Sequence, residues 1–183
     1  MFRVSKKKNS LLRDKSGASA VEFAIIAPVF LATMFSTFEV GWFYFVNSVV
    51  DGATIGISRE IRTGQITGGQ NFDPDEFFAN DVCPTLEFLE DCDTRVTAEV
   101  RVFPNFAALA ADTSPVVCRD DDPSLVNNIQ VDPGNENEII RVRICLIYDT
   151  LNPAIGVNLA KSDDGSRRIT STYVFRNEPY EEL

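Results

Sequence analysis

The residue of this chain with the clearest chemical potential is Glu22, a single carboxylate at the start of a long apolar run. It lies five positions after Gly17, and residues 23–38, which follow it, carry no charge. A carboxylate costs roughly 2.5–3.5 kcal/mol at the centre of a bilayer and less toward the interface, so an ionisable side chain in a membrane segment is a functional candidate by default. The alternative is a bystander at the lipid headgroups, and the spacing from Gly17 argues against it.

No residue pattern typical of an enzyme occurs in the sequence. The chain has no histidine, which removes Ser-His-Asp and Cys-His nucleophile systems and the most common general base. Phosphate-binding and nucleophile-elbow motifs are missing as well. The acidic residues 120–122 and 163–164 have Pro, Ser and Gly neighbours, which indicates solvated loops, and they lack the spacing of a calcium loop. We therefore expect a protein that is not an enzyme and holds no cofactor or metal.

Cysteine usage indicates an oxidising compartment. Cys83, Cys92, Cys118 and Cys145 all follow the apolar run, and an even number confined to one part of a chain is typical of disulfides. Four cysteines allow three connectivities. We favour Cys83–Cys92, which closes a short helical loop, together with Cys118–Cys145, which ties a loop to a strand. A zinc site is disfavoured because CxxC pairs and histidines are absent.

Charge divides the chain into a basic leader and an acidic remainder. Residues 1–17 carry six Lys or Arg and one Asp, whereas the rest holds 11 basic and 26 acidic residues, a net charge of −15. Such an acidic exterior argues against nucleic acid as a partner. The positive-inside rule predicts that the leader stays in the cytoplasm while the part after the apolar run crosses the membrane.

The apolar run is long enough to span a bilayer. Residues 21–42 supply the roughly 20 residues that a membrane helix needs, with Glu39 and the aromatic residues 42–45 near the outer interface. A cleavable secretory signal is the alternative, but bulky aromatic residues stand where its small cleavage residues would be needed. Pro28 removes one helical hydrogen bond and predicts a kink.

The helix is expected to continue beyond the membrane to residue 63. Apolar residues recur there at three- and four-residue spacing, which is typical of an amphipathic helix with one stripe on a soluble core. Thr63 and Gly64 supply a C-terminal stop.

The remaining residues predict a small α+β domain. Short helices are expected at 74–81 and 84–90, and alternating apolar residues predict strands at 96–102, 140–146 and 168–175. The first of these strands should have one wet face. The expected fold is pilin-like, with the outer half of the long helix packed on a three- or four-stranded antiparallel sheet.

The junction at residues 17–23, Pro28 and the helical continuation resemble the TadE-like pseudopilin family of Tad (Flp-type) pilus assembly, with a type III prepilin signal. The resemblance is strong over about residues 10–63, and residues 174–180 also look like TadE-like C-termini. It implies that a prepilin peptidase cuts between Gly17 and Ala18, and that Glu22 and Phe23 serve in assembly.

The resemblance divides the chain into a cleaved leader at 1–17, a spine helix at 18–63 and a periplasmic domain at 64–183. It implies a structural component of the bacterial inner membrane, with the N-terminus cytoplasmic, whose partners are the peptidase and other pilin or pilus assembly subunits. The alternative is an uncleaved, membrane-anchored periplasmic binding module.

Overall fold

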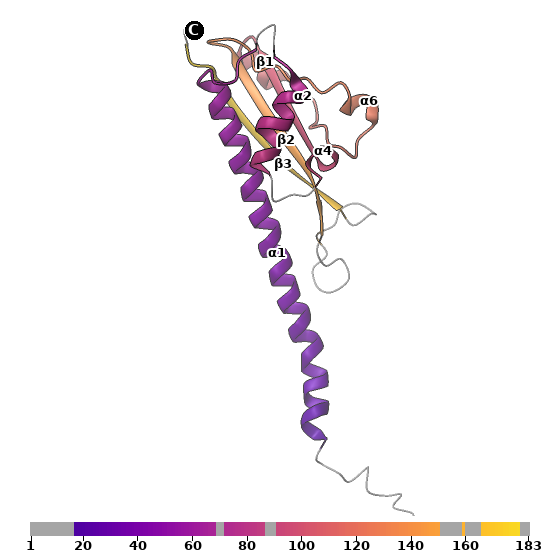
Figure 1. Cartoon of the computed structure of the whole chain (residues 1–183). Coiled ribbons are helices and arrows are strands. Elements are labelled where there is room, and N and C mark those ends of the chain that lie inside the picture. The colour runs from indigo at the N-terminus through magenta and orange to yellow at the C-terminus, as the bar shows by residue number, and fades with distance from the viewer. Residues whose placement is uncertain (1–16, 69–71, 87–90, 151–158, 160–165, 180–183) are drawn as a thin grey trace, which may run out of the picture.

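The protein consists of one long helix that carries a small sheet domain at its C-terminal half (Figure 1). The structure is a computed structural model, which describes residues 17–68, 72–86, 91–150, 159 and 166–179. The elements are α1 (Ala18–Arg62), α2 (Pro74–Phe77), the π-helical turn η1 (Phe78–Val82), α3 (Cys83–Thr85), α4 (Cys92–Arg95), β1 (Val96–Phe103), α5 (Phe106–Ala111), α6 (Pro123–Val126), β2 (Ile139–Asp149) and β3 (Ser166–Arg176). The expected α+β arrangement is confirmed.

Helix α1 is continuous over 45 residues, with Pro28 inside it. At its C-terminal end, Thr63 caps the helix and Gly64 adopts a positive φ of 75°, a conformation that glycine reaches without steric cost. The backbone N–H of Glu178 then donates to the carbonyl of Arg62, and the two side chains form an ion pair at 3.2 Å. The end of the described chain is thereby tied to the end of α1.

The three strands form an antiparallel sheet in the order β1-β2-β3. The register places Ala98 opposite Ile144 and Ile144 opposite Ser171. The buried residues that lie on the same face as Ala98 and Ile144 include Val96, Val100, Val142, Leu146 and Ile169. Because side chains alternate between faces along a strand, this register sets which residues meet α1.

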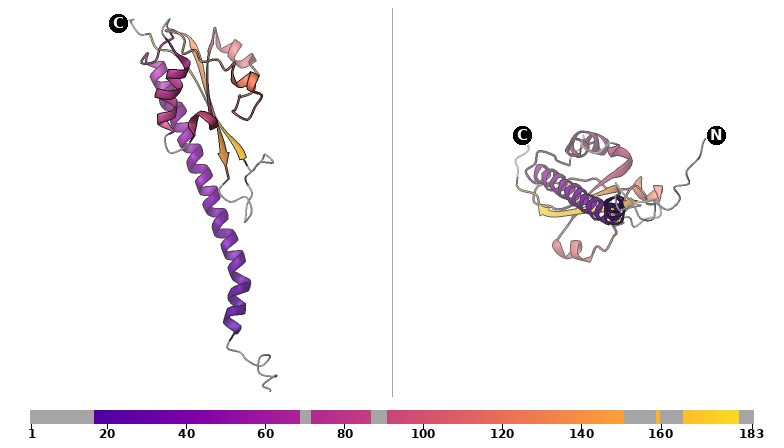
Figure 2. Two further views of the ribbon diagram at one scale, coloured as in Figure 1. Left: turned by 45° about the vertical axis from the view of Figure 1, so that its right-hand side comes forward. Right: turned by 90° about the horizontal axis from the view of Figure 1, so that it is seen from below.

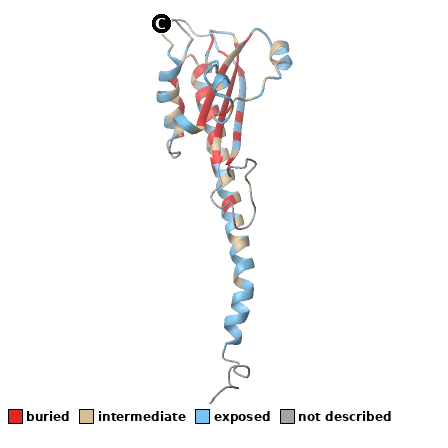
Figure 3. Ribbon diagram, turned by 90° about the vertical axis from the view of Figure 1, so that its right-hand side faces the viewer, coloured by how far each residue is buried: buried red, intermediate tan, exposed pale blue. Residues whose placement is uncertain are grey.

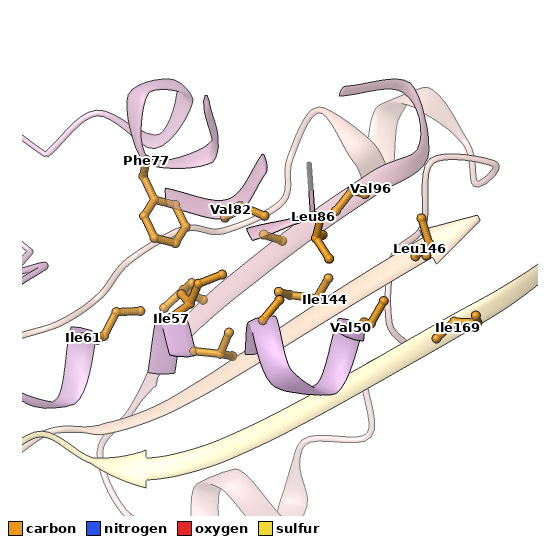
Figure 4. Close-up of a cluster of buried hydrophobic side chains, with 14 of the residues drawn as sticks. Val50, Ile57, Ile61, Phe77, Val82, Leu86, Val96, Ile144, Leu146 and Ile169 are labelled. Carbon is orange, nitrogen blue, oxygen red and sulfur yellow. The ribbon is translucent and has the colours of Figure 1, made fainter. Parts of the chain in front are cut away.

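The hydrophobic core lies between that face of the sheet and two helical pieces. The outer half of α1 packs on β2 and β3, and the α2–α3 stretch covers β1 beside it (Figures 1 and 4). Fully buried aliphatic side chains from each piece meet there: Val50, Ile57, Ile61, Val82, Leu86, Val96, Ile144 and Leu146. The apolar stripe predicted for residues beyond 45 is therefore the stripe that docks the helix on the domain.

The opposite face of the sheet is covered as well. The prediction that one face of the first strand is exposed to solvent is therefore wrong. Thr97 and Glu99 on that face of β1 are 3% and 7% exposed. The connection between β1 and β2, which carries α5 and α6, lies over them on the side away from α1 (Figure 2). Thr97 donates to the carbonyl of Val117, and a disulfide joins Cys118 to Cys145 of β2. The alternation identified the two faces, but a distant loop decides whether water reaches the second.

The predicted helix at 84–90 is wrong in its bounds. A helical stretch runs without a break from Pro74 through η1 to Thr85, and Leu86 ends it. Pro84 lies near the C-terminal end of this stretch, where it supplies no backbone N–H to the helical hydrogen bonds. The stretch ends at Leu86 because its backbone there leaves the helical region while its side chain enters the core. Residues 87–90 lie outside the described part.

Candidate functional site

The predicted cleavage site lies at the first residue of α1. Gly17 caps the helix without a side chain, and its carbonyl accepts hydrogen bonds from the N–H groups of Ala20 and Val21 at 3.1 and 3.2 Å. Gly17 is exposed, and open space surrounds the position where a Cβ would be. The Gly17–Ala18 peptide bond is therefore at the accessible tip of the helix.

Glu22 and Phe23 lie on the bare part of this helix. Both are exposed, Phe23 at 72%, and within the described residues Glu22 has no salt-bridge partner. Glu22 follows Ala18 by four residues, so the two lie on one face of the helix, about one turn apart. The carboxylate and the predicted new N-terminus therefore point to the same side.

The segment from Ala18 to Phe38 is not covered by the domain, and we call it the bare segment (Figure 3). Nine large apolar side chains are exposed along it: Val21, Phe23, Ile25, Ile26, Val29, Phe30, Leu31, Phe35 and Phe38. At 1.5 Å per residue the segment is about 31 Å long, which matches a hydrocarbon core of roughly 30 Å. Helix α1 is the one described helix that is long and apolar enough to cross a membrane.

Glu39 marks the boundary between the bare segment and the domain. It is the first buried residue of α1, at 2% exposure, and its Oε1 accepts a hydrogen bond from the hydroxyl of Tyr148 at 3.0 Å. The Tyr148 ring packs edge-on against Phe43, and the Arg167 guanidinium lies 4.9 Å from the centre of the Phe43 ring. Burial and the hydrogen bond to Glu39 together raise the pKa of Tyr148 above its usual range.

Sequence reasoning placed Glu39 at the membrane interface but missed its burial. The missing information is the position of β2 and β3, since the end of β2 supplies Tyr148 and the start of β3 supplies Arg167. A charged residue that interrupts an apolar run is the only sequence signal that pointed to this position.

The four cysteines form two disulfides, Cys83–Cys92 and Cys118–Cys145, which is the pairing favoured from the sequence. The first links α3 to the start of α4. The second holds the α5–α6 connection against β2, with both sulfur-bearing residues buried. Its position explains how the second face of the sheet stays covered.

The acidic residues 120–122 are not simply solvated. Asp120 and Asp121 form ion pairs with Arg168 of β3 at 2.9 and 2.8 Å, and Asp121 also accepts the backbone N–H of Cys118. That N–H and the guanidinium of Arg168 lower the pKa of Asp121. Asp122 caps α6 through the N–H of Ser124. These carboxylates fasten the connection to the sheet. Residues 163–164 lie outside the described part.

A charged cluster beneath the same connection was not foreseen from the sequence. Glu99 makes a bidentate ion pair with Arg143, while Asp112 joins Arg101 and Arg141 at 3.2 and 2.7 Å. Hydrogen bonds from the N–H and hydroxyl of Ser114, followed by Arg141, hold the pKa of Asp112 well below its usual range. The alternation of Glu and Arg with apolar residues in β1 and β2 was the available signal, and in β1 it was attributed to solvent exposure.

No group of three or more His, Cys, Asp or Glu side chains suited to a metal ion is found within the described ranges.

Comparison with known proteins identifies one segment of the chain. A family model described as "TadE-like protein" matches residues 17–55. Neither the curated proteins nor the solved structures contain a match. The matched segment begins at Gly17, includes Glu22 and extends into the part of α1 that packs on the domain. Residues 17–55 are therefore similar to the TadE-like family, the resemblance that the sequence suggested.

Proposed function

We propose that this protein is a pilin-like structural component of a Tad-type pilus assembly or secretion system, without chemistry of its own. The observation that carries the proposal is the start of α1, where an exposed glycine at the helix boundary precedes a carboxylate on a bare apolar helix. The TadE-like match over the same residues supports it.

In the proposed mechanism, a prepilin peptidase cleaves the Gly17–Ala18 bond and releases the basic leader. The leader stays in the cytoplasm, α1 crosses the inner membrane, and the sheet domain lies in the periplasm. Cleavage converts the amide of Ala18 into an ammonium group. An unpaired carboxylate in lipid is costly, and pairing with a cation offsets that cost.

We further propose that Glu22 of one subunit pairs with the Ala18 ammonium of its neighbour. Since both groups lie on one face of the helix, a neighbouring helix shifted by about one turn brings the two charges together. Phe23 and the other exposed apolar side chains would pack against the adjacent helices. The charge pair would then set the axial register of each added subunit.

The first test concerns processing. A Gly17→Leu variant should retain its leader, because the peptidase needs a small residue before the scissile bond. The measurement is the intact mass and N-terminus of the protein from cells that contain the peptidase. The wild type should begin at Ala18 and the variant at Met1. A wild-type chain that keeps its leader would favour the alternative, an uncleaved membrane-anchored periplasmic binding module.

The second test separates assembly from anchoring. Glu22→Val should insert into the membrane and fold normally, since the side chain contacts no part of the described domain, but it should not support surface pili in a deletion strain. Glu22→Asp, which keeps the carboxylate, is the matched control and should restore pili at least in part. Normal piliation by Glu22→Val at normal abundance would refute the role of the carboxylate.

A further inference from the structure

A cavity of about 380 Å³ opens on the side of the sheet away from α1. Its floor is the charged face of β1 and β2, with Glu99, Arg101 and Arg143, and its walls are apolar side chains from the overlying connection: Val117, Leu125 and Ile129. The volume lies at the low end of the range for small-molecule pockets, enough for a ligand the size of one or two amino-acid residues.

Among the described residues, the charges at the floor of this cavity do not balance. The cluster contains three guanidinium groups, of Arg101, Arg141 and Arg143, and two carboxylates, of Glu99 and Asp112. One positive charge is therefore left in a region where Glu99, Arg141 and Arg143 are each 7% exposed or less. Partly desolvated charges are stabilised by a partner of opposite sign, so an additional anion would complete the cluster.

Arg101 is the member of the cluster that is placed to receive that anion. Its side chain is 30% exposed, the most of the five, and it lines the cavity. Its Nε donates to Gln130 and forms an ion pair with Glu99 at 3.1 Å, and its Nη1 donates to Asp112 and Ser114, whereas its Nη2 makes no hydrogen bond to the described residues. Arg143, in contrast, uses all three nitrogens on Glu99 and Ser114. One edge of the Arg101 guanidinium is thus held rigidly, while its Nη2 donor remains available.

We propose that this cavity binds a carboxylate attached to an apolar body, with the carboxylate on Arg101 and the body between Val117, Leu125 and Ile129. A carboxylate would bring the cluster to three charges of each sign. Planar guanidinium groups match carboxylates in geometry, and the apolar walls would remove the ligand body from water. A peptide C-terminus and a free organic acid share this chemistry.

The test is a titration of the ¹⁵N-labelled full-length chain in nonionic detergent micelles, followed at the Nε–H signal of Arg101. N-acetyl-leucine represents a peptide terminus and hexanoate a free acid, and the amide of each lacks the charge. We expect the acids to bind in the millimolar range, as for other ligands of this size. The amides should bind about tenfold more weakly, since a charge-assisted hydrogen bond is lost.

The relative affinities of the two acids show whether the carboxylate ligand is a peptide terminus or a free organic acid. Stronger binding of N-acetyl-leucine supports a peptide terminus, and stronger binding of hexanoate supports a free acid. Equal affinity for acids and amides, or no shift by either acid at 50 mM, would overturn the proposal.

Two variants keep the test independent of folding. Arg101→Gln, followed at the backbone amide signals of the lining residues Val117 and Ile129 in both this variant and the wild type, should abolish the preference for acid over amide. Its folding is checked by the two disulfides and the thermal midpoint. Asn128→Trp places a large ring at an exposed position of the cavity wall and should block all four ligands without removing any member of the charged cluster. Arg59→Gln removes an exposed guanidinium on α1, on the other side of the sheet, and should bind like the wild type. Unchanged binding by Asn128→Trp would place the ligand elsewhere.

Discussion

Two carboxylates on the same helix have opposite environments. Glu22 is exposed on the bare segment, whereas Glu39, seventeen residues later, is buried beneath the end of β2. The first is therefore available to a neighbouring subunit, and the second belongs to the fold. Its contact with Tyr148 fixes the level at which the domain meets α1, immediately after the bare segment ends at Phe38.

We expect Tyr148→Phe to lower the free energy of unfolding by roughly 1–3 kcal/mol, because a buried carboxylate loses a hydrogen-bond donor while the ring contact with Phe43 is kept. Denaturant unfolding of the chain in micelles, followed by the fluorescence of Trp42, measures the change. Tyr173→Phe is the matched control, since that side chain is partly exposed and its hydroxyl has no hydrogen bond in the described structure. Equal stabilities of the two variants would contradict a role for the Glu39–Tyr148 contact.

At the scale of elements, the connection between β1 and β2 acts as a second layer over the sheet. A disulfide to Cys145 and carboxylates that pair with arginines hold it, because few apolar side chains are available on that face. The chain-entropy model assigns about 3.6 kcal/mol to a disulfide closing a loop of this length. The layer therefore depends on charge and covalent linkage more than the α1 side of the sheet does.

We expect a low pH to destabilise the packing of this connection on the sheet. The pKa of Asp112 is lowered in the folded state from the ordinary value of 3.8. Its contribution to stability is thus fully present above pH 4 and is lost as the pH falls through the folded pKa. We expect the wild type to lose more stability than Asp112→Asn between pH 6 and pH 2, and to be the more stable of the two at pH 6.

Amide hydrogen exchange in β1 and the residues after α5 measures this effect, with Asp93→Asn, an exposed carboxyl, as control. Parallel acid dependence of wild type and Asp112→Asn would show that the Asp112 ion pairs do not hold the layer.

At the scale of the molecule, α1 has two environments along one continuous helix. The first 21 residues are bare and apolar, while the remainder packs its apolar stripe on the sheet (Figure 3). A long apolar surface outside the domain is stable in a membrane or against other apolar helices, but not in water. The domain begins where the bare segment reaches the thickness of a bilayer.

Two substitutions of exposed apolar residues distinguish the halves. Val29→Lys places a charge near the middle of the bare segment, at a cost of roughly 2.5–3.5 kcal/mol in a bilayer, and should reduce the fraction that resists alkaline extraction from membranes. Ile55→Lys changes a residue of similar exposure, 52% against 67%, on the half that carries the domain. It should remain fully membrane-bound. If both variants behaved alike, the bare segment would not be the membrane anchor.

Local chemistry made much of this protein predictable. The helix from residue 18, the stripe that docks it, the three strands and the position of Gly17 and Glu22 follow from short-range patterns that the chain itself carries. The disulfide pairing favoured from the sequence, one bridge closing a short helical loop and the other tying a loop to a strand, is also the pairing in the structure. Apolar periodicity and an isolated carboxylate are signals that do not depend on the rest of the fold.

Only the tertiary structure decided which polar residues, far apart in the chain, are buried and which partners they contact. Glu39 meets Tyr148 across 109 positions, and Glu99 meets Arg143 across 44. A polar residue on an alternating strand looks the same in sequence whether water or another segment covers it. The cavity and its unbalanced charge exist because the α5–α6 connection folds over the sheet, and its path depends on contacts that no local pattern records.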